Sequence, residues 1–319
     1  MSIELTITLL AVIALTLYTV RSQRAIGNKV TEAIRLNNEL LRKLNSKEKN
    51  ITREVAKVRD QLNLLNLAIP GVENGDFKYV LSLTSHPARF SALAQVLPLL
   101  KYQVLAPEKV LLNIAHQDME SLPASVRDLA KSGFITINEV EDLGPGKKLI
   151  PTLVQFPDLP IIVIDDDLYL TPDLTLQLML EHKLYPTSII ASRVHHITYY
   201  EDGSIKPFSA WDKASESFDG PALDLVATSG AGTLFPPHSL HDEALDVNRY
   251  KELAFHTDDL WWYFQAQRIG TTVRRLPGHR PLEFVPESQE DGLWRTGNKD
   301  RNEENLQKLI KEIGALHGN

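Results

Sequence analysis

The sequence predicts an α/β protein with a mostly parallel sheet flanked by helices, and three observations lead to this fold class. Short β-branched runs alternate with helix-like segments from about residue 77 onward, which is the pattern of a parallel sheet. An acidic triplet, Asp165-Asp166-Asp167, directly follows one of these runs. The first 70 residues follow a different pattern, first apolar and then heptad-like, so we expect them to form a separate N-terminal part.

Composition narrows the class of protein. The chain has 319 residues and contains no cysteine, which excludes a disulfide framework and a thiolate nucleophile. The net charge of -7 is unevenly distributed, because residues 21–61 hold eleven Lys or Arg against five Asp or Glu. The remainder of the chain is therefore strongly acidic. An acidic main domain argues against nucleic acid as a partner.

Residues 1–20 predict a transmembrane signal anchor. The run from Leu5 to Val20 is apolar apart from threonines and one tyrosine; it is shorter than the roughly 20 residues of a typical span, a gap that local bilayer thinning closes. The alternative, a cleaved signal peptide, expects preceding basic residues and a small-residue cleavage site, and the sequence has neither. Arg21 and Arg24 follow the run, so the positive-inside rule predicts a single-pass membrane protein whose C-terminal domain faces the cytoplasm.

Residues 21–70 predict a basic coiled-coil stalk. Apolar residues recur at spacings of three and four from Val30 to Ile69, with Asn37 and Glu48 as interruptions, which is typical of a coiled coil and indicates a homo-oligomer at the membrane. The alternative is an amphipathic helix that lies on the main domain. Pro70 ends the helix, residues 71–76 form a linker, and residues 77–319 form the globular domain.

Strands and helices alternate in the globular domain. The predicted strands are Tyr79–Leu83, Lys109–Ile114, Phe134–Ile137, Ile161–Ile164, Ser188–Ala191 and Thr272–Leu276. The predicted helices are Phe90–Leu100, Ala124–Ser132, Asp259–Ile269 and Asn302–Leu316.

The triplet Asp165-Asp166-Asp167 is the main candidate for chemistry. It follows the apolar run Leu159–Ile164, and open α/β sheets bind ligands outside the carboxyl ends of their strands. Clustered carboxylates suit a hard divalent cation that carries phosphate oxygens. The triplet therefore predicts a metal–nucleotide site, and the alternative is an acidic turn on the surface.

Two further segments offer groups for a phosphate. Thr84 to Arg89 leaves the first strand, where backbone N–H groups can dock a nucleotide and Arg89 can clamp a phosphate or stack on a base. The turn Gly144–Leu149 carries Lys147 and Lys148, either of which can neutralise a diphosphate, but it lacks the spacing of a P-loop. The alternatives are a helix-start turn with a solvated arginine and an ordinary surface loop.

Two later segments complete the candidate site. Gly230 and Gly232 permit close approach of the backbone to a ligand; the alternative is a bulged strand beside a turn. One carboxylate of Asp258 and Asp259 can serve as a general base toward a hydroxyl; the alternative assigns the acids to helix capping and the neighbouring tryptophans to the core. His256 or His279 can complete a metal shell around Asp165 and Asp167.

Taken together, five segments resemble the GT-A-fold, nucleotide-sugar-dependent glycosyltransferases of the bacterial surface-polysaccharide type. They are Ser82–Arg89, Gly144–Leu149, Asp165–Asp167, Gly230–Gly232 and Asp258–Trp261, in the same order as in that family. The resemblance covers about residues 77–305 and implies a GT-A-like, Rossmann-like sheet. It does not extend to the N-terminal 70 residues.

The resemblance also implies roles for individual residues. Asp165 and Asp167 would hold Mn²⁺ or Mg²⁺ on the diphosphate of a nucleotide-sugar donor, and Lys148 matches the lysine of the Gly-Pro-x-x-Lys turn. Asp259 or its neighbour Asp258 would activate the acceptor hydroxyl in an inverting displacement.

The expected function is therefore a membrane-anchored, metal-dependent glycosyltransferase that acts on a glycan or a lipid-linked acceptor, at the inner membrane if the protein is bacterial. One alternative is metal-dependent sugar nucleotidyl or phosphoryl transfer, against which the absence of glycine from Thr84 to Arg89 counts. A second is a non-catalytic, membrane-anchored coiled-coil scaffold with a degenerate transferase domain, against which the intact acidic residues count.

Overall fold

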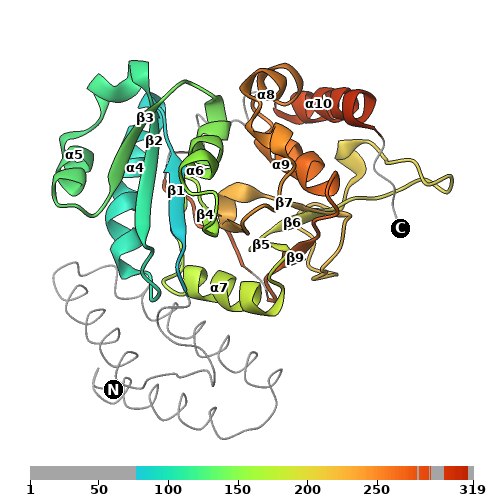
Figure 1. The fold of residues 1–319 in the computed structure, drawn as a ribbon, viewed down its shortest axis with the longest axis horizontal. Coiled ribbons are helices and arrows are strands. Elements are labelled where there is room, and N and C mark those ends of the chain that lie inside the picture. The colour runs from blue at the N-terminus through green and yellow to red at the C-terminus, as the bar shows by residue number, and fades with distance from the viewer. Residues whose placement is uncertain (1–76, 279, 287, 289–297, 315–319) are drawn as a thin grey trace, which may run out of the picture. The chain divides into compact units, whose positions relative to one another are not determined.

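A computed structural model describes residues 77–278, 280–286, 288 and 298–314 (Figure 1). The chain divides into two units, Met1–Glu73 and Asn74–Asn319, and all described residues belong to the second. The predicted anchor (1–20), coiled-coil stalk (21–70) and linker (71–76) lie outside the described residues. Within the described part of the chain, no helix is both long and apolar enough to cross a membrane.

Seven strands form the central sheet, in the order β3-β2-β1-β4-β8-β5-β9. Pairing is parallel except on the two sides of β8, which runs antiparallel to both β4 and β5. The strands are β1 (Val80–Thr84), β2 (Lys109–Ala115), β3 (Thr136–Val140), β4 (Ile161–Val163), β5 (Ile189–Ala191), β8 (Thr233–Phe235) and β9 (Val273–Arg275). A separate antiparallel pair joins β6 (Val194–His196) and β7 (Leu225–Ala227). The predicted fold class, a mostly parallel sheet in a Rossmann-like α/β arrangement, is confirmed.

Helices cover both faces of the sheet (Figure 1). They are α4 (Phe90–Val96), α5 (Ala124–Lys131), α6 (Ile150–Gln155), α7 (Leu174–Leu184), α8 (Val247–Leu253), α9 (Asp258–Gln267) and α10 (Asn298–Ile313). Helices α4, α5 and α7 share one hydrophobic cluster with the sheet, and α6, α8, α9 and α10 share the other. The protein therefore has a three-layer α/β/α arrangement.

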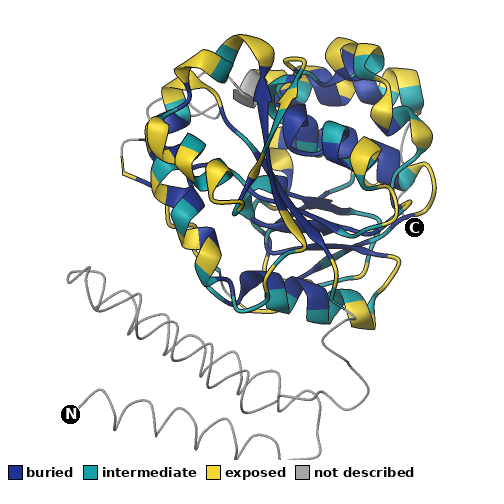
Figure 2. Cartoon of the chain, turned by 60° about the vertical axis from the view of Figure 1, so that its left-hand side comes forward, coloured by how far each residue is buried: buried dark blue, intermediate teal, exposed yellow. Residues whose placement is uncertain are grey.

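The central strands form because both of their faces are buried. In β4, Ile162 belongs to one hydrophobic cluster, whereas Ile161 and Val163 belong to the other. All three side chains are at most 1% exposed, and complete burial of such a side chain stabilises the fold by roughly 1.5–3 kcal/mol. Figure 2 shows the buried strands between helices whose outer surfaces are exposed. An uninterrupted apolar run is the expected sequence for a strand buried on both faces.

Some elements differ from the sequence prediction. The predicted helix Phe90–Leu100 becomes α4 followed by a 3-10 helix, Leu97–Tyr102, with a proline at its start, because proline supplies no N–H for the regular ladder. Strand β3 lies further along the chain than predicted and pairs Thr136 with Leu111. Helix α7 was not predicted. Strand β8 follows Gly230 and Gly232 directly, where the sequence offered a strand as the alternative to a ligand-binding segment.

Strand order places the candidate site. Strands β2 and β3 lie on one side of β1, and β4 lies on the other, so the order reverses between β1 and β4. Ligands of open α/β sheets bind outside the carboxyl ends of the strands at such a switch point. The segments after Thr84 and after Val163 both begin at this edge. Antiparallel β8 begins there as well, because its Thr233 pairs with Val163.

Candidate active site

The acidic triplet is held in place by the backbone of three other segments. Asp165 N–H donates to the Gly230 carbonyl at 2.9 Å, and Val285 N–H donates to the Asp167 carbonyl at 2.8 Å. Before the triplet, the N–H of Ile164 donates to the Ser82 carbonyl at 3.1 Å. Asp166 and Asp167 are 7% and 2% exposed. The alternative of an acidic surface turn is therefore wrong for these two residues.

Arg89 forms ion pairs with the buried carboxylates of the triplet. Its Nη1 contacts Asp167 closely and lies 3.4 Å from Asp166, whose carboxylate also accepts a hydrogen bond from Ser85 Oγ. Burial raises the pKa of Asp166 to about 7, although Ser85 and Arg89 oppose the shift. Burial, together with Asp165, also raises the pKa of Asp167. The alternative of a solvated Arg89 is wrong, and its predicted contact with a phosphate or base stays a prediction.

The turn that carries Lys148 is fixed from two sides. The 3-10 helix Gly144–Lys148 packs so closely on Tyr250 that a Cβ at Gly146 would lie 2.6 Å from the tyrosine ring. The N–H of Gly146 donates to Tyr250 Oη at 3.1 Å, and Ser82 Oγ donates to the Lys148 carbonyl at 2.6 Å. These contacts bring the end of the turn against β1, beside the triplet.

Lys148 links the triplet to the acidic pair at the start of α9. Its Nζ lies 2.6 Å from Asp165 Oδ1 and 3.4 Å from Asp258 Oδ2. Burial lowers the pKa of Lys148, but Asp165, Asp258 and Asp259 outweigh burial, so the pKa stands well above its ordinary value. Lys148 therefore stays charged and can donate charge-assisted hydrogen bonds, but its carboxylate neighbours already compensate its charge.

The neighbouring Lys147 has a different partner. Its Nζ lies 2.5 Å from Asp142 Oδ1, and the Asp142 carboxylate is about half exposed. The sequence did not distinguish the two lysines. In the structure, Lys148 is the one that contacts the triplet.

Asp259 is the candidate general base. Its Oδ1 accepts hydrogen bonds from the Ser229 N–H at 2.9 Å and from Ser229 Oγ at 2.5 Å. Burial and the neighbouring Asp258 raise the pKa of Asp259 to about 7, against the opposing effects of Lys148 and Ser229. A carboxylate with a pKa near 7 is suited to exchange protons with a hydroxyl near neutral pH.

Helix capping does not explain the acidic pair. Thr257 is the N-cap residue of α9, and its hydroxyl donates to the Ala254 carbonyl instead of accepting from the helix. Asp259 bonds Ser229 outside the helix. The prediction that the neighbouring tryptophans pack in the core is confirmed, because Trp261 and Trp262 are 0% and 2% exposed and belong to the core.

The two glycines before β8 are required by close packing. A Cβ at Gly230 would overlap the Asp165 carboxylate, so a side chain there would displace the triplet. Gly232 has a φ of +103° and faces Leu174, a conformation that favours glycine. The structure therefore uses Gly230 to seat Asp165, and its predicted approach to a ligand stays a prediction.

Asp165 and Asp167, the carboxylates predicted to hold a metal ion, contact Lys148 and Arg89 respectively. No group of three or more His, Asp or Glu side chains that could hold a metal ion occurs among the described residues. His256 lies outside such a group, because its ring packs on Phe255 at 4.2 Å and adjoins Gly144; His279 lies outside the described residues. Asp165 and Asp167 still suit Mg²⁺ or Mn²⁺, since Mg²⁺ commonly binds one or two carboxylates and completes its shell with water and substrate phosphate.

Several residues of the site were missed by the sequence prediction. Ser82, Ser85 and Ser229 each position a predicted residue through a hydrogen bond. Thr84, a predicted nucleotide-binding residue, ends β1, and its Oγ1 donates to the Asn113 carbonyl at 2.7 Å. A serine beside a predicted residue is too common a pattern to indicate a role before the strands are placed.

Fold and site together define an α/β protein with a Rossmann-like sheet and a carboxylate–lysine site at its switch point. No protein-family model matches the chain, and no curated protein matches it. Among solved structures, it is similar to a 4-diphosphocytidyl-2C-methyl-D-erythritol synthase, at 11% identity and a TM-score of 0.41 over 67% of this chain and 93% of that one.

It is also similar to a CMP:2-keto-3-deoxy-manno-octonic acid synthetase complexed with CTP, at 9% identity and a TM-score of 0.37 over 67% of this chain and 95% of that one. At such low identity these structures assign no function to this chain. They also do not confirm the glycosyltransferase family.

Proposed function

We propose that this protein is a transferase that uses a nucleotide-activated sugar and transfers the sugar to a hydroxyl group of an acceptor. The observation that carries the proposal is Asp259, which Ser229 holds through two hydrogen bonds and whose pKa burial raises to about 7. Its neighbour Asp258 contacts Lys148, which in turn contacts Asp165 of the triplet. A hydroxyl nucleophile requires a base such as Asp259. Lys148 and the triplet supply the adjacent site for a diphosphate leaving group.

The reaction would proceed as a single in-line displacement. Asp259 accepts the proton of the acceptor hydroxyl while the oxygen of that hydroxyl forms a bond to the anomeric carbon. The bond from that carbon to the diphosphate breaks, and the leaving nucleoside diphosphate interacts with Lys148. A divalent cation bound by Asp165 and Asp167 would neutralise charge on that diphosphate. Attack opposite the leaving group inverts the anomeric configuration.

Sugar nucleotidyl transfer is the second candidate, and the position of Arg89 favours it. Arg89 and Lys148 contact different members of the triplet, so two cations are available to a longer phosphate chain such as that of a nucleoside triphosphate. An anionic nucleophile in that reaction would not need a base. The raised pKa of Asp259 therefore supports glycosyl transfer as the first candidate.

Both candidate functions require metal-dependent binding of a nucleotide, and calorimetry with the full-length chain tests this requirement. The panel contains nucleoside diphosphates, their sugars and nucleoside triphosphates including CTP, each measured with Mn²⁺ and with EDTA. We expect metal-dependent binding of a nucleotide that the Asp165→Ala/Asp167→Ala variant loses. Asp142→Asn is the matched control, because Asp142 pairs with Lys147 away from the triplet. Absence of nucleotide binding by the folded wild-type protein would contradict both candidates and favour the scaffold alternative.

A further inference from the structure

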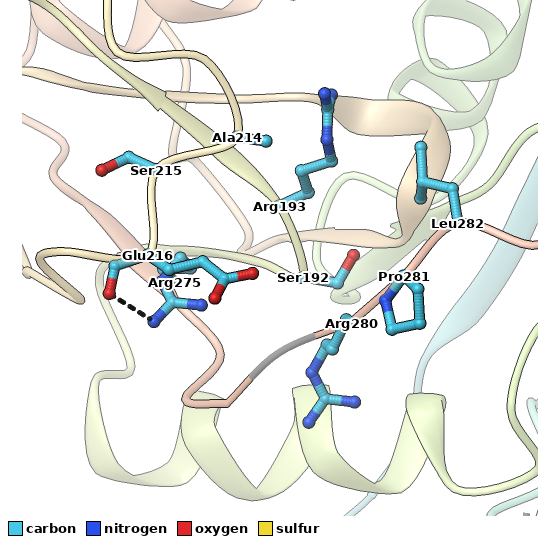
Figure 3. Close-up of a pocket in the computed structure, with 9 residues that line it drawn as sticks. All are labelled: Ser192, Arg193, Ala214, Ser215, Glu216, Arg275, Arg280, Pro281 and Leu282. Carbon is cyan, nitrogen blue, oxygen red and sulfur yellow. Dashed lines mark hydrogen bonds between the residues drawn. The ribbon is translucent and has the colours of Figure 1, made fainter.

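A cavity of about 240 Å³ lies beside the candidate site (Figure 3). Three segments line it: Ser192–Arg193 after β5, the loop Ala214–Glu216, and the residues from the end of β9 onward, which include Arg275 and Arg280–Leu282. Neither the triplet nor the acidic pair of α9 belongs to its lining. The proposed mechanism therefore leaves this cavity without a role.

One wall of the cavity continues into the segment that holds the candidate base. Ser192 Oγ donates to the Ala231 carbonyl at 2.5 Å, and Arg193 Nη1 lies 3.4 Å from Thr228 Oγ1. Thr228 immediately precedes Ser229, whose N–H and hydroxyl bind Asp259. A group bound in the cavity would therefore lie next to the place where an acceptor hydroxyl must reach Asp259.

The opposite wall continues into the acidic triplet. The segment that begins at Arg280 runs on to Phe284, which forms a β-bridge with Leu168, and to Val285, which donates to the Asp167 carbonyl at 2.8 Å. The cavity thus adjoins both parts of the site, the proposed base and the proposed diphosphate position. This is the location expected for an acceptor rather than for a second, unrelated ligand.

Positive charge dominates the lining of the cavity. Its ionisable members are Arg193, Arg275, Arg280 and Glu216. Arg275 is ion-paired with Asp219 and donates to the carbonyl of Gly278 at 2.9 Å. One arginine of the three is therefore already neutralised within the protein.

The other two arginines have no such compensation. In the part of the chain that the structure describes, no carboxylate lies within ion-pairing distance of Arg193 or Arg280. Arg280 hydrogen-bonds Gln177 of α7, a neutral side chain, and its Nε is buried without a partner. Burial lowers the pKa of both arginines, and only the more distant Asp259 and Asp173 oppose it. Arg193 and Arg280 are only partly buried, and a bound counter-charge would offset the cost of removing such charges from water.

We propose that this cavity binds an anionic group of the acceptor, a sugar that carries a phosphate or a carboxylate. The inference rests on the proposed function, because it assigns the cavity to the second substrate of that reaction. An oxyanion would provide the missing counter-charge, and guanidinium groups bind phosphate and carboxylate through charge-assisted hydrogen bonds. Pro281 and the 37% exposed Leu282 supply an apolar surface for the sugar ring at the same opening. Figure 3 shows the guanidinium groups of Arg193 and Arg280 pointing in opposite directions, with that of Arg280 directed toward Gln177 of α7.

The test compares three sugars that differ in charge. Glucuronate, glucose 6-phosphate and glucose are titrated into the full-length chain, with binding followed by ligand-observed NMR, in the presence and absence of a saturating nucleoside diphosphate. The saturating nucleotide occupies the site beside the triplet, so that the sugar phosphate cannot bind there instead of in the cavity. We expect at least one acidic sugar to bind about tenfold more tightly than glucose, in line with charge-assisted hydrogen bonds. A preference for one acidic sugar identifies which oxyanion the cavity takes.

Two variants and one control assign the binding to the cavity. Arg280→Gln should weaken binding of the acidic sugar by about tenfold and leave binding of glucose unchanged. Leu282→Glu adds a negative charge at the opening without disturbing a buried residue. Because it also removes part of the apolar surface for the sugar ring, it should weaken binding of the acidic sugar more than binding of glucose. Arg274→Gln is the matched control, because Arg274 is paired with Glu181 and does not line the cavity.

The outcomes separate this inference from the proposed function. Nucleotide binding is measured on the same samples, and both cavity variants should retain it. Equal binding of charged and neutral sugars, or acidic-sugar binding that survives both cavity variants, overturns the inference even when nucleotide binds. If nucleotide binding fails while the acidic sugar binds through Arg280, the cavity is an anion site and the proposed function is wrong.

Discussion

Lys148 is the residue on which the charge balance of the site depends. It lies between Asp165 at 2.6 Å and Asp258 at 3.4 Å, and it is buried. We expect Lys148→Met to lower the free energy of unfolding by about 3 kcal/mol, because it leaves buried carboxylates without their counter-charge. Urea denaturation of wild type and variant measures the change.

Lys147→Met is the matched control for that experiment. Lys147 pairs with Asp142, whose carboxylate is about half exposed, so the loss of Lys147 should cost less stability and leave nucleotide binding intact. An equal loss of stability and of binding in the two variants would contradict the role assigned to Lys148.

Asp259 makes the protein sensitive to pH in a defined direction. Its pKa is raised from 3.8 to about 7 in the folded protein, so between these values the folded state holds more protons than the unfolded state, and stability falls as the pH rises. We expect the unfolding midpoint in urea to decrease from pH 4.5 to pH 7.5, and Asp259→Asn to reduce that decrease. Asp166, whose pKa is also raised to about 7, contributes with the same sign. Burial lowers the pKa of His195 to about 3, which acts with the opposite sign below about pH 6.5. The test is therefore the difference between the two proteins, and the same slope in the variant would contradict the assignment.

At the residue scale, the sequence predicted the candidate side chains of the site but not the residues that contact them. The triplet was predictable because an apolar strand runs directly into it. The choice between Lys147 and Lys148 was not, because it depends on how the 3-10 turn Gly144–Lys148 is rotated by its contacts with Ser82 and Tyr250. Those partners are 66 and 104 residues away in the chain, and no local pattern encodes them.

At the scale of elements, burial decided which predictions succeeded. Strands β1, β2 and β4 are mostly apolar because both of their faces are covered, with Ser82 and Asn113 as buried polar exceptions. The sequence predicted all three. Helix α7 was missed because its apolar residues have weak periodicity: Leu174, Leu178 and Met179 are buried, whereas Leu176 and Leu180 on other faces are only partly buried. Strand β8 has only three residues, too few for a period-2 pattern.

At the scale of the whole molecule, strand order creates the site. Four segments far apart in sequence meet at one edge of the sheet because β4 lies beside β1 and antiparallel β8 lies on the other side of β4. The sequence predicted a mostly parallel sheet, but the order of its strands depends on packing between layers. The membrane anchor, the cytoplasmic orientation of the main domain and oligomerisation through the stalk stay predictions, since residues 1–76 lie outside the described part of the chain.

The measurement that tests the central claim most directly is the reaction catalysed by wild type and Asp259→Asn with the nucleotide sugar that binds. Proton NMR follows the released nucleotide and the anomeric configuration of the product. We predict release of a nucleoside diphosphate, an inverted product, and a rate about 10²- to 10⁴-fold lower in Asp259→Asn, as expected for the loss of a general base. Release of pyrophosphate from a triphosphate, a retained configuration, or an unchanged rate in Asp259→Asn would contradict the account.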